Sequence, residues 1–118
     1  MVKVKDPFRY LTDKEKRAVL QFKEKVLQIE PEAKLILYGS KARGDYHEES
    51  DIDVLVVVPD LDWSKKRKIL DTAVEVEEKH GFSVLLGVMI IDKYSFEKSP
   101  VFKGSLYYRN VKEEGVLL

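Results

Sequence analysis

Two short apolar runs stand out in the pattern of hydrophobic and polar positions along the chain. Residues 35–38 and 54–58 are aliphatic, β-branched or aromatic and are bounded by turn residues, which is typical of buried β-strands. A third run of this kind, residues 82–91, follows a glycine and ends at an aspartate. The pattern therefore predicts three strands, with a polar connection between the first two.

Apolar residues at helical spacing predict two long helices, over residues 12–30 and 64–80. Thr12 and Glu15 have the spacing of a capping box at the start of the first helix. Ser64 is expected to cap the second helix, and a glycine follows its end. The expected buried stripes are Val19, Phe22, Val26 and Ile29 in the first helix and Ile69, Ala73 and Val76 in the second.

The last part of the chain is less regular. Two short helices are expected over residues 94–98 and 106–114, separated by a Ser-Pro pair. Residues 116–118 are apolar, so this end either packs back on the sheet or forms an interface. In the second case, the chain could form a homo-oligomer.

With 118 residues, we expect a single domain that spans residues 1–118. It would consist of an N-terminal helix at about 12–30, a core over 34–92 and a C-terminal helical segment over 93–118. The predicted fold class is α/β (α+β), with the order α-β-α-β-α-β-α. Flanking helices would pack mainly on one face of a small mixed sheet.

Composition and charge narrow the class of protein. Hydrophobic residues make up 44% of the chain and charged residues 36%, with 21 basic and 21 acidic side chains. This balance argues against a general nucleic-acid binder, which carries a basic excess. The chain has no cysteine, which excludes disulfides and zinc–thiolate sites. No apolar run approaches the ~20 residues of a membrane span, and no signal peptide is visible, so we expect a cytoplasmic protein.

The candidate chemistry lies in the connection between the first two strands. Asp51 and Asp53 are two positions apart at the start of a strand, so their side chains share one face. Two carboxylates so close together repel each other, and Mg²⁺, which prefers oxygen ligands and phosphates, is the natural ion between them. Gly39 and Ser40 follow the preceding strand and let the backbone approach phosphate oxygens. If residues 40–44 open a short helix, its N-terminus also favours anions.

A simpler interpretation of the two aspartates is that they only protect the edge of an adhesive strand, as inward charges do in some sheets. One charge would be enough for that purpose, and the Gly-Ser pair would have no explanation.

The whole connection has a recognisable pattern. A Gly-Ser pair at 39–40 and, ten residues later, Asp-Ile-Asp at 51–53 resemble the signature of the DNA polymerase β-type nucleotidyltransferase superfamily. The longer strings Gly-Ser-Lys-Ala-Arg-Gly (39–44) and Ser-Asp-Ile-Asp (50–53) are most similar to the minimal nucleotidyltransferases (MNT). That group includes the antitoxin half of HEPN–MNT toxin–antitoxin pairs. The similarity is dense over residues 35–58.

The resemblance implies a polymerase β-like nucleotidyltransferase fold and transfer of AMP from ATP to a hydroxyl acceptor. Asp51 and Asp53 would be the catalytic residues and would bind Mg²⁺ or Mn²⁺. The Gly-Ser pair would hold the β- and γ-phosphates, and the arginine that follows it could add a bidentate phosphate contact. The expected nucleotide-binding residues are Gly39, Ser40, Arg43 and Ser50.

The resemblance also implies a third acidic residue on the third strand. The position that faces the site falls on Ser83 or Leu85, and neither is acidic. Asp92 lies at the far end of that strand, on the opposite alternation. The chain departs here from the pattern of the family, which bears on catalysis more than on nucleotide binding.

Several functions stay open at this level. The acceptor that the resemblance implies is a tyrosine of a partner HEPN protein, which AMP transfer would silence. The main alternative is a binding module that neutralises its partner by occupying it. Transfer to a small aminoglycoside-like molecule is a weaker hypothesis, because no second domain walls an acceptor pocket. Extension of RNA 3′ ends is weaker still, given the neutral charge.

Three further features receive simple interpretations. The basic run 65–68 is interpreted as a solvated helix face, although it could reach phosphate or RNA. Trp63 is expected to be a packing residue. His47, in the polar connection, could touch nucleotide.

Overall fold

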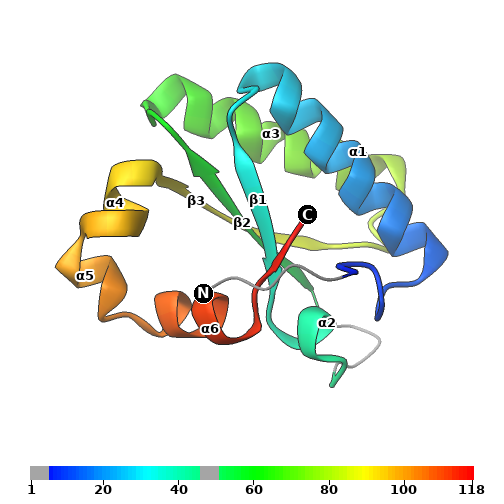
Figure 1. Cartoon of the computed structure of the whole chain (residues 1–118). Helices are drawn as coiled ribbons and strands as arrows, with labels where there is room; N and C mark the ends of the chain where they lie inside the picture. The colour runs from blue at the N-terminus through cyan, green and yellow to red at the C-terminus, as the bar shows by residue number, and fades with distance from the viewer. Residues whose placement is uncertain (1–5, 46–50) are drawn as a thin grey trace.

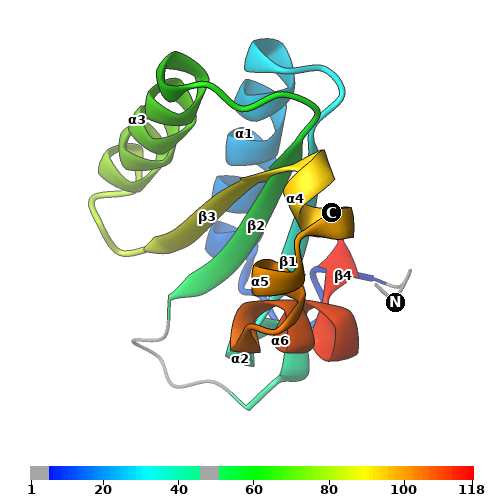
Figure 2. The same cartoon turned by 90° about the vertical axis from the view of Figure 1, so that its left-hand side faces the viewer.

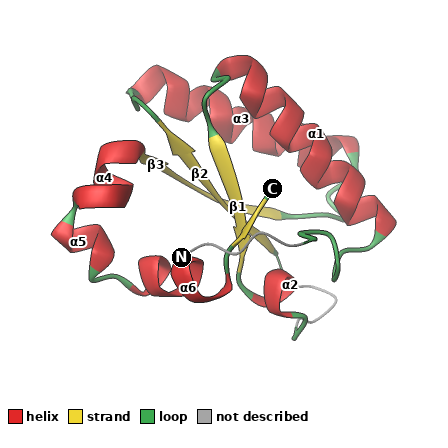
Figure 3. Cartoon of the chain, in the orientation of Figure 1, coloured by secondary structure: helices red, strands yellow, loops and turns green. Residues whose placement is uncertain are grey.

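The computed structural model describes residues 6–45 and 51–118 of the chain. Within these residues, four strands form one sheet in the order β3-β2-β1-β4. Figure 2 shows this order from left to right, and Figure 3 colours the strands yellow. β1 runs antiparallel to β2 and to β4, whereas β2 and β3 are parallel. The strands are β1 (Lys34–Tyr38), β2 (Ile52–Val58), β3 (Leu86–Asp92) and β4 (Val116–Leu117). The helices are α1 (Asp13–Ile29), α2 (Ser40–Arg43), α3 (Trp63–Lys79), α4 (Lys93–Lys98), α5 (Pro100–Lys103) and α6 (Leu106–Glu114).

Helices lie on both faces of the sheet (Figures 1 and 2). The two long helices, α1 and α3, pack side by side on one face, where the larger hydrophobic core lies. The short helices α4 to α6 cover part of the other face over a smaller core that includes Ile36, Leu55 and Phe102. The mixed sheet with flanking helices is thus confirmed, while the expectation that helices pack mainly on one face holds only for the two long ones.

α1 forms where the pattern predicts it. Thr12 accepts a hydrogen bond from the Glu15 amide, and the Glu15 side chain accepts one from the Thr12 amide, so the predicted capping box is present. Val19, Phe22 and Val26 are fully buried, and Ile29 is partly buried against the same core. The helix ends before Pro31, as expected for a residue that precedes proline.

The start of α3 differs from the prediction. Asp62, not Ser64, is the N-cap, because its carboxylate accepts a hydrogen bond from the Lys65 amide at 2.7 Å. Trp63 therefore lies in the first turn, and it is 75% exposed rather than packed in the core. The predicted buried stripe of Ile69, Ala73 and Val76 is confirmed.

The third strand begins four residues later than predicted. Residues 81–85 form the connection between α3 and β3. Gly81 and Phe82 both have positive φ, and the Phe82 amide donates a hydrogen bond to the Glu77 carbonyl. This is the left-handed exit that ends many helices. β3 then starts at Leu86, opposite Ile52 of β2. An apolar run alone cannot show that its first residues form a turn.

The C-terminus packs back on the sheet, which was one of the two expected outcomes. β4 pairs with the middle of β1, and the Leu118 amide donates to the Leu35 carbonyl. Across the described parts of the chain, no helix has the length and apolar character needed to cross a membrane.

Candidate active site

Asp53 lies near the start of β2, an inner strand of the sheet. This is the end of the sheet at which the chain leaves β1 and enters the turn at Gly39 and Ser40. Asp53 lies opposite Tyr38 of β1 and beside Gly87 of β3. Side chains alternate along a strand, so Asp53 points to the same face as Leu55 in the smaller core. Asp51 precedes the strand and is exposed, whereas Asp53 is partly buried. Both side chains lie next to Gly87 of β3, and the charge of Asp51 acts on the Asp53 carboxyl, so the two share one side of the sheet, as the sequence predicts.

Gly39 lies against the Asp53 carboxylate. Its backbone has φ 80° and ψ −160°, a region that is essentially restricted to glycine. A Cβ atom at this position would lie 2.3 Å from Asp53 Oδ2. Its carbonyl accepts hydrogen bonds from the amides of Ala42 and Arg43, which starts α2. Glycine is therefore required here both by the turn and by the approach of the carboxylate.

The predicted short helix is confirmed, and it brings Ser40 to the same end of the sheet. α2 begins at Ser40, and the Gly44 amide closes it by donating to the Ser40 carbonyl at 2.8 Å. The first N–H groups of a helix have no partner within the helix and suit anionic oxygens. This turn is the part of the site that could hold phosphate.

Burial and like charge act together on Asp53. Its partial burial raises the pKa of the carboxyl, the neighbouring Asp51 raises it further, and Arg43 opposes both effects. Burial also raises the pKa of the Tyr38 phenol to about 12, with help from Asp53 and Tyr107. Tyr38 therefore stays protonated at neutral pH. A cation between Asp51 and Asp53 would relieve the repulsion between them.

The position beside Asp53 on β3 is Gly87, not Ser83 or Leu85 as the sequence suggested. The late start of β3 moves the register, so that Asp53 pairs with Gly87. A Cβ atom at Gly87 would lie 2.8 Å from Asp53 Oδ1 and 3.8 Å from Asp51 Cβ. β3 thus presents bare backbone to both aspartates at this glycine, the position where the family resemblance implies an acidic side chain.

Arg43 is held at the edge of the site by two carboxylates. Its Nε contacts both oxygens of Asp45 at 3.0 and 3.1 Å, and a terminal nitrogen pairs with Glu114 Oε2. These partners raise the pKa of the guanidinium. Glu114, at the end of α6, is a residue that sequence reasoning missed. Its Oε1 is buried and accepts no hydrogen bond within the described part of the chain.

Lys41 is a second residue that the sequence did not single out. Its side chain is almost fully buried, and its Nζ lies 2.7 Å from Glu15 Oε2. This ion pair joins the Gly-Ser turn to α1, because Glu15 is also the capping-box residue. The only signal in the sequence was the position of a lysine inside the Gly-Ser string.

A hollow of about 500 Å³ opens beside Asp53, over the outer strand of the sheet. Its lining includes two charged residues, Asp53 and Lys66, and two tyrosines among apolar side chains. Its lining comes from three strands and two helices (Tyr38, Asp53, Lys66, Leu70, Gly87, Val88, Met89, Ile90 and Tyr107). The hollow is suitable in size and position for part of a nucleotide or of an acceptor.

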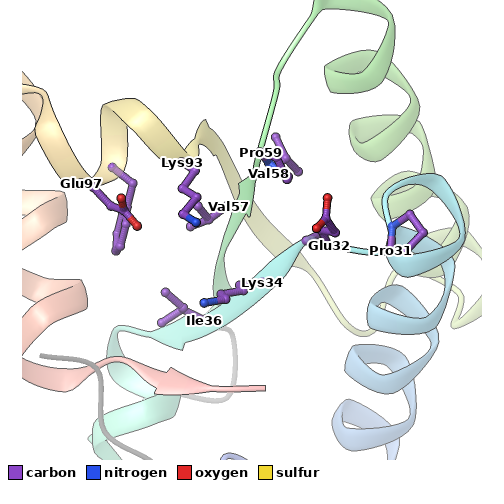
Figure 4. Close-up of a pocket in the computed structure, with 11 residues that line it drawn as sticks. Pro31, Glu32, Lys34, Ile36, Val57, Val58, Pro59, Lys93 and Glu97 are labelled. Carbon is purple, nitrogen blue, oxygen red and sulfur yellow. The ribbon is translucent and has the colours of Figure 1, made fainter.

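A second hollow, of about 530 Å³, lies at the opposite end of β1 and β2, where α4 meets the sheet (Figure 4). Two lysines and two glutamates line it (Lys34 and Lys93, Glu32 and Glu97). None of the residues that the sequence assigns to the site lies there. Its mixed charges define no ligand, so we place the candidate active site at Asp53.

The structure therefore brings together Gly39, Asp51 and Asp53, with Ser40 on the adjoining turn and Arg43 at the edge. Ser50 and His47 lie outside the described residues. Among the described residues, no group of three or more histidine, cysteine or acidic side chains could hold a metal ion. Two converging carboxylates still fit a hard divalent cation, which often takes only one or two of them and fills its other positions with water and phosphate.

Comparison with known proteins agrees with the fold. The family model for the nucleotidyltransferase domain matches residues 19–118, and the chain belongs to this family. The matched segment includes every strand and the whole of the candidate site. The chain is thus a nucleotidyltransferase of the MNT type, as the Gly-Ser and Asp-x-Asp motifs indicated.

Two relatives are proteins of Methanocaldococcus jannaschii. The first, named "Putative protein adenylyltransferase MJ0604", is 39% identical over 85 residues, which cover 72% of this chain and 76% of the relative. The second, "Putative protein adenylyltransferase MJ0141", is 43% identical over 61 residues, which cover 51% of this chain and 60% of that protein.

Proposed function

We propose that the chain transfers AMP from ATP to a tyrosine of a partner protein, and that this partner is a HEPN toxin. The observation that carries the proposal is Asp53, held between Gly39 and Gly87 with Asp51 beside it. A pair of carboxylates next to the turn at Gly39 and Ser40 could bind a nucleoside triphosphate together with Mg²⁺ or Mn²⁺. The names of the two relatives support a protein as the acceptor.

The residues would divide the work as follows. Asp51 and Asp53 would hold the divalent ion, and Gly39 and Ser40 would hold the β- and γ-phosphates through the turn at the start of α2. Such an ion, when bound, stabilises negative charge on the phosphoryl oxygens. Arg43 would turn part of its guanidinium from its aspartate partner to phosphate, since an arginine can make bidentate contacts with phosphate oxygens.

The reaction exchanges one bond for another at the α-phosphorus. The bond from the acceptor oxygen to the α-phosphorus forms, the bond to the β,γ-diphosphate breaks, pyrophosphate leaves, and the acceptor proton passes to solvent. Gly87 supplies no carboxylate to take that proton. A phenol, with a pKa near 10, needs less help than an alkyl hydroxyl. This favours tyrosine as the acceptor.

The test is to express the chain together with a HEPN partner and to measure the intact mass of the partner. We expect the wild type to add the mass of AMP. Asp53→Asn should abolish or strongly reduce the addition. Asp60→Asn is the matched control, because Asp60 is an exposed aspartate in the loop after β2, outside the site. The control should modify the partner as the wild type does, and an equal loss in both variants would contradict the assignment of the site to Asp53.

The alternative function is neutralisation by binding alone, and Gly87 is the observation that favours it. Without a third carboxylate, the site would bind nucleotide but transfer it slowly, because general-base assistance is worth about 10²–10⁴-fold. A partner that stays unmodified beside the wild-type chain, yet is bound and silenced, would replace the transfer hypothesis with this one.

A further inference from the structure

The outer edge of β3 is open within the described part of the chain. β3 is the last strand in the sheet order and pairs only with β2 (Figure 2). The Ile52 amide donates to the Leu85 carbonyl, which fixes the phase of the parallel ladder. Leu86, Val88 and Ile90 accordingly direct their backbone groups away from β2. Glu77 satisfies the Leu86 amide, but the edge from Val88 to Ile90 carries neither the charge nor the proline that commonly protects such edges.

α3 extends this edge with an apolar stripe of its own. Trp63, Leu70 and Val74 are 75%, 39% and 50% exposed. Their spacing of seven and four residues places them on one side of the helix, away from the buried stripe. Leu70 lines the same hollow as Val88 and Ile90, so helix and strand form one continuous apolar face. We refer to Trp63, Leu70, Val74, Val88 and Ile90 as the edge face.

The charges of α3 are divided along its length. The first half carries the basic run at residues 65–68. Asp71 stands at the middle, and Glu75, Glu77 and Glu78 follow in the second half before Lys79 ends the helix. Two such helices side by side in parallel would bring the two basic runs together and the two acidic segments together. In an antiparallel arrangement, the basic half of one helix lies along the acidic half of the other.

The centre of the apolar stripe fixes the register of such a pair. When Leu70 of one helix faces Val74 of the other, Lys66 faces Glu78 and Trp63 faces the turn that follows the helix. Phe82, in that turn, is itself 57% exposed. One twofold axis thus pairs apolar residues at the centre of the stripe, opposite charges beside it and aromatic residues at its ends.

We propose that the edge face binds a second copy of this chain, with β3 pairing antiparallel to β3 and α3 to α3 across a twofold axis near Val88. The two sheets would join into one of eight strands. α3 has 17 residues and is about 25 Å long, and β3 has seven and is about 23 Å long. The two elements match in length, so both contribute to the whole face. Twofold dimers are the commonest symmetric assemblies.

A foreign extended segment could satisfy the backbone edge, but the charge pattern favours a second copy. An antiparallel copy of α3 places acidic side chains against Lys66 and Arg67 and basic ones against Glu77 and Glu78. Assembly through β3 and α3 requires neither nucleotide nor metal. Because Leu70, Val88 and Ile90 also line the hollow beside Asp53, a second copy on the edge face would cover that side of the hollow.

The test uses charge reversal and analytical ultracentrifugation. The wild type should sediment as a dimer at micromolar concentrations. Lys66→Glu brings two glutamates together in its own dimer, and Glu78→Lys brings two lysines together, so each variant alone should sediment as a monomer. Mixed in equal amounts, the two variants should form a one-to-one heterodimer. One of its two contacts between positions 66 and 78 then joins the original lysine and glutamate, and the other joins the reversed pair, so both contacts are attractive. Lys66 also lines the hollow beside Asp53, so assembly and not activity is the quantity measured.

A second pair of variants tests the apolar part of the face. Leu70→Glu should weaken the dimer by at least tenfold in Kd. Leu20→Glu is the matched control, because Leu20 is a leucine of α1 with 40% exposure, against 39% for Leu70, and does not belong to the edge face. The proposal is wrong if the wild type stays monomeric up to about millimolar concentration. It is equally wrong if the charge-reversed variants remain dimers or do not combine with each other.

Discussion

Replacing Gly39 with alanine adds one carbon atom at the point where the turn meets the Asp53 carboxylate. The new atom would lie 2.3 Å from Asp53 Oδ2, whereas ordinary contacts of a Cβ begin at 3.4 Å. The carboxylate must therefore move by about 1 Å or the turn must open. Either change displaces a ligand of the proposed metal–nucleotide site.

The substitution should lower two quantities, the stability of the fold and the affinity for nucleotide, and these are measured separately. The backbone at φ 80° and ψ −160° strains any residue other than glycine by about 1–3 kcal/mol. For a domain of this size, that corresponds to a fall in melting temperature of roughly 4–12 °C. The displaced carboxylate should lower affinity for Mg²⁺–ATP by at least about tenfold, which equals ~1.4 kcal/mol of binding free energy.

Substitutions at two other glycines distinguish the loss of stability from the loss of nucleotide affinity. Gly81 has φ 63° and nothing within 4 Å of its Cβ position, so Gly81→Ala should lose stability without losing nucleotide. Gly87 has no positive φ, but its Cβ would lie 2.8 Å from Asp53 Oδ1, so Gly87→Ala should lose nucleotide with little loss of stability. Gly39→Ala should lose both. Thermal melts and titration calorimetry measure the two quantities on the same samples.

A folded Gly39→Ala variant that binds Mg²⁺–ATP as tightly as the wild type would contradict this prediction. That result would mean that the turn at Gly39 does not position the Asp53 carboxylate for nucleotide. A binding loss in Gly81→Ala equal to that in Gly39→Ala would indicate that backbone strain alone reduces affinity.

Two predictions concern stability. Lys41→Met should destabilise the domain by about 3 kcal/mol in urea unfolding, because it leaves the Glu15 carboxylate without its buried partner, and adding Glu15→Gln should recover much of this loss. The Asp92 carboxylate caps α4 and accepts hydrogen bonds from the Ser95 hydroxyl and amide, which lower its pKa. Its stabilisation is present above the ordinary pKa of aspartate, about 3.9, and is lost as the pH falls through the lower folded value. The excess melting temperature of the wild type over Asp92→Asn should therefore shrink as the pH falls from neutral to strongly acidic, and a constant difference would contradict this.

The sequence predicted the parts of the fold that depend on local pattern. The runs at 35–38 and 54–58 are apolar at every position and have turn residues on both sides, so their assignment as strands needed no tertiary information. The capping box at Thr12 and the pairing of Asp51 with Asp53 on one face follow from spacing alone. Gly39 was assigned by its position after a strand, and its backbone angles agree with that role.

The parts that were missed depend on contacts between distant residues. The register of β3 against β2 decides that Gly87 lies beside Asp53, and the left-handed exit from α3 shifts that register. Glu114 reaches Arg43 from a position 71 residues away in the chain. Trp63 was expected to pack because it is large and apolar, but α3 begins at this residue and leaves its side chain exposed.

The measurement that tests the central claim most directly is calorimetric titration of ATP into the wild type and into Asp51→Asn/Asp53→Asn, each with and without Mg²⁺. We predict that the wild type binds ATP more tightly with Mg²⁺, and that the double variant loses this difference. Its melting temperature should stay the same or rise, because the repulsion between two carboxylates is removed. Equal affinity of both proteins for ATP in the presence of Mg²⁺ would contradict the assignment of the two aspartates as the metal–nucleotide site.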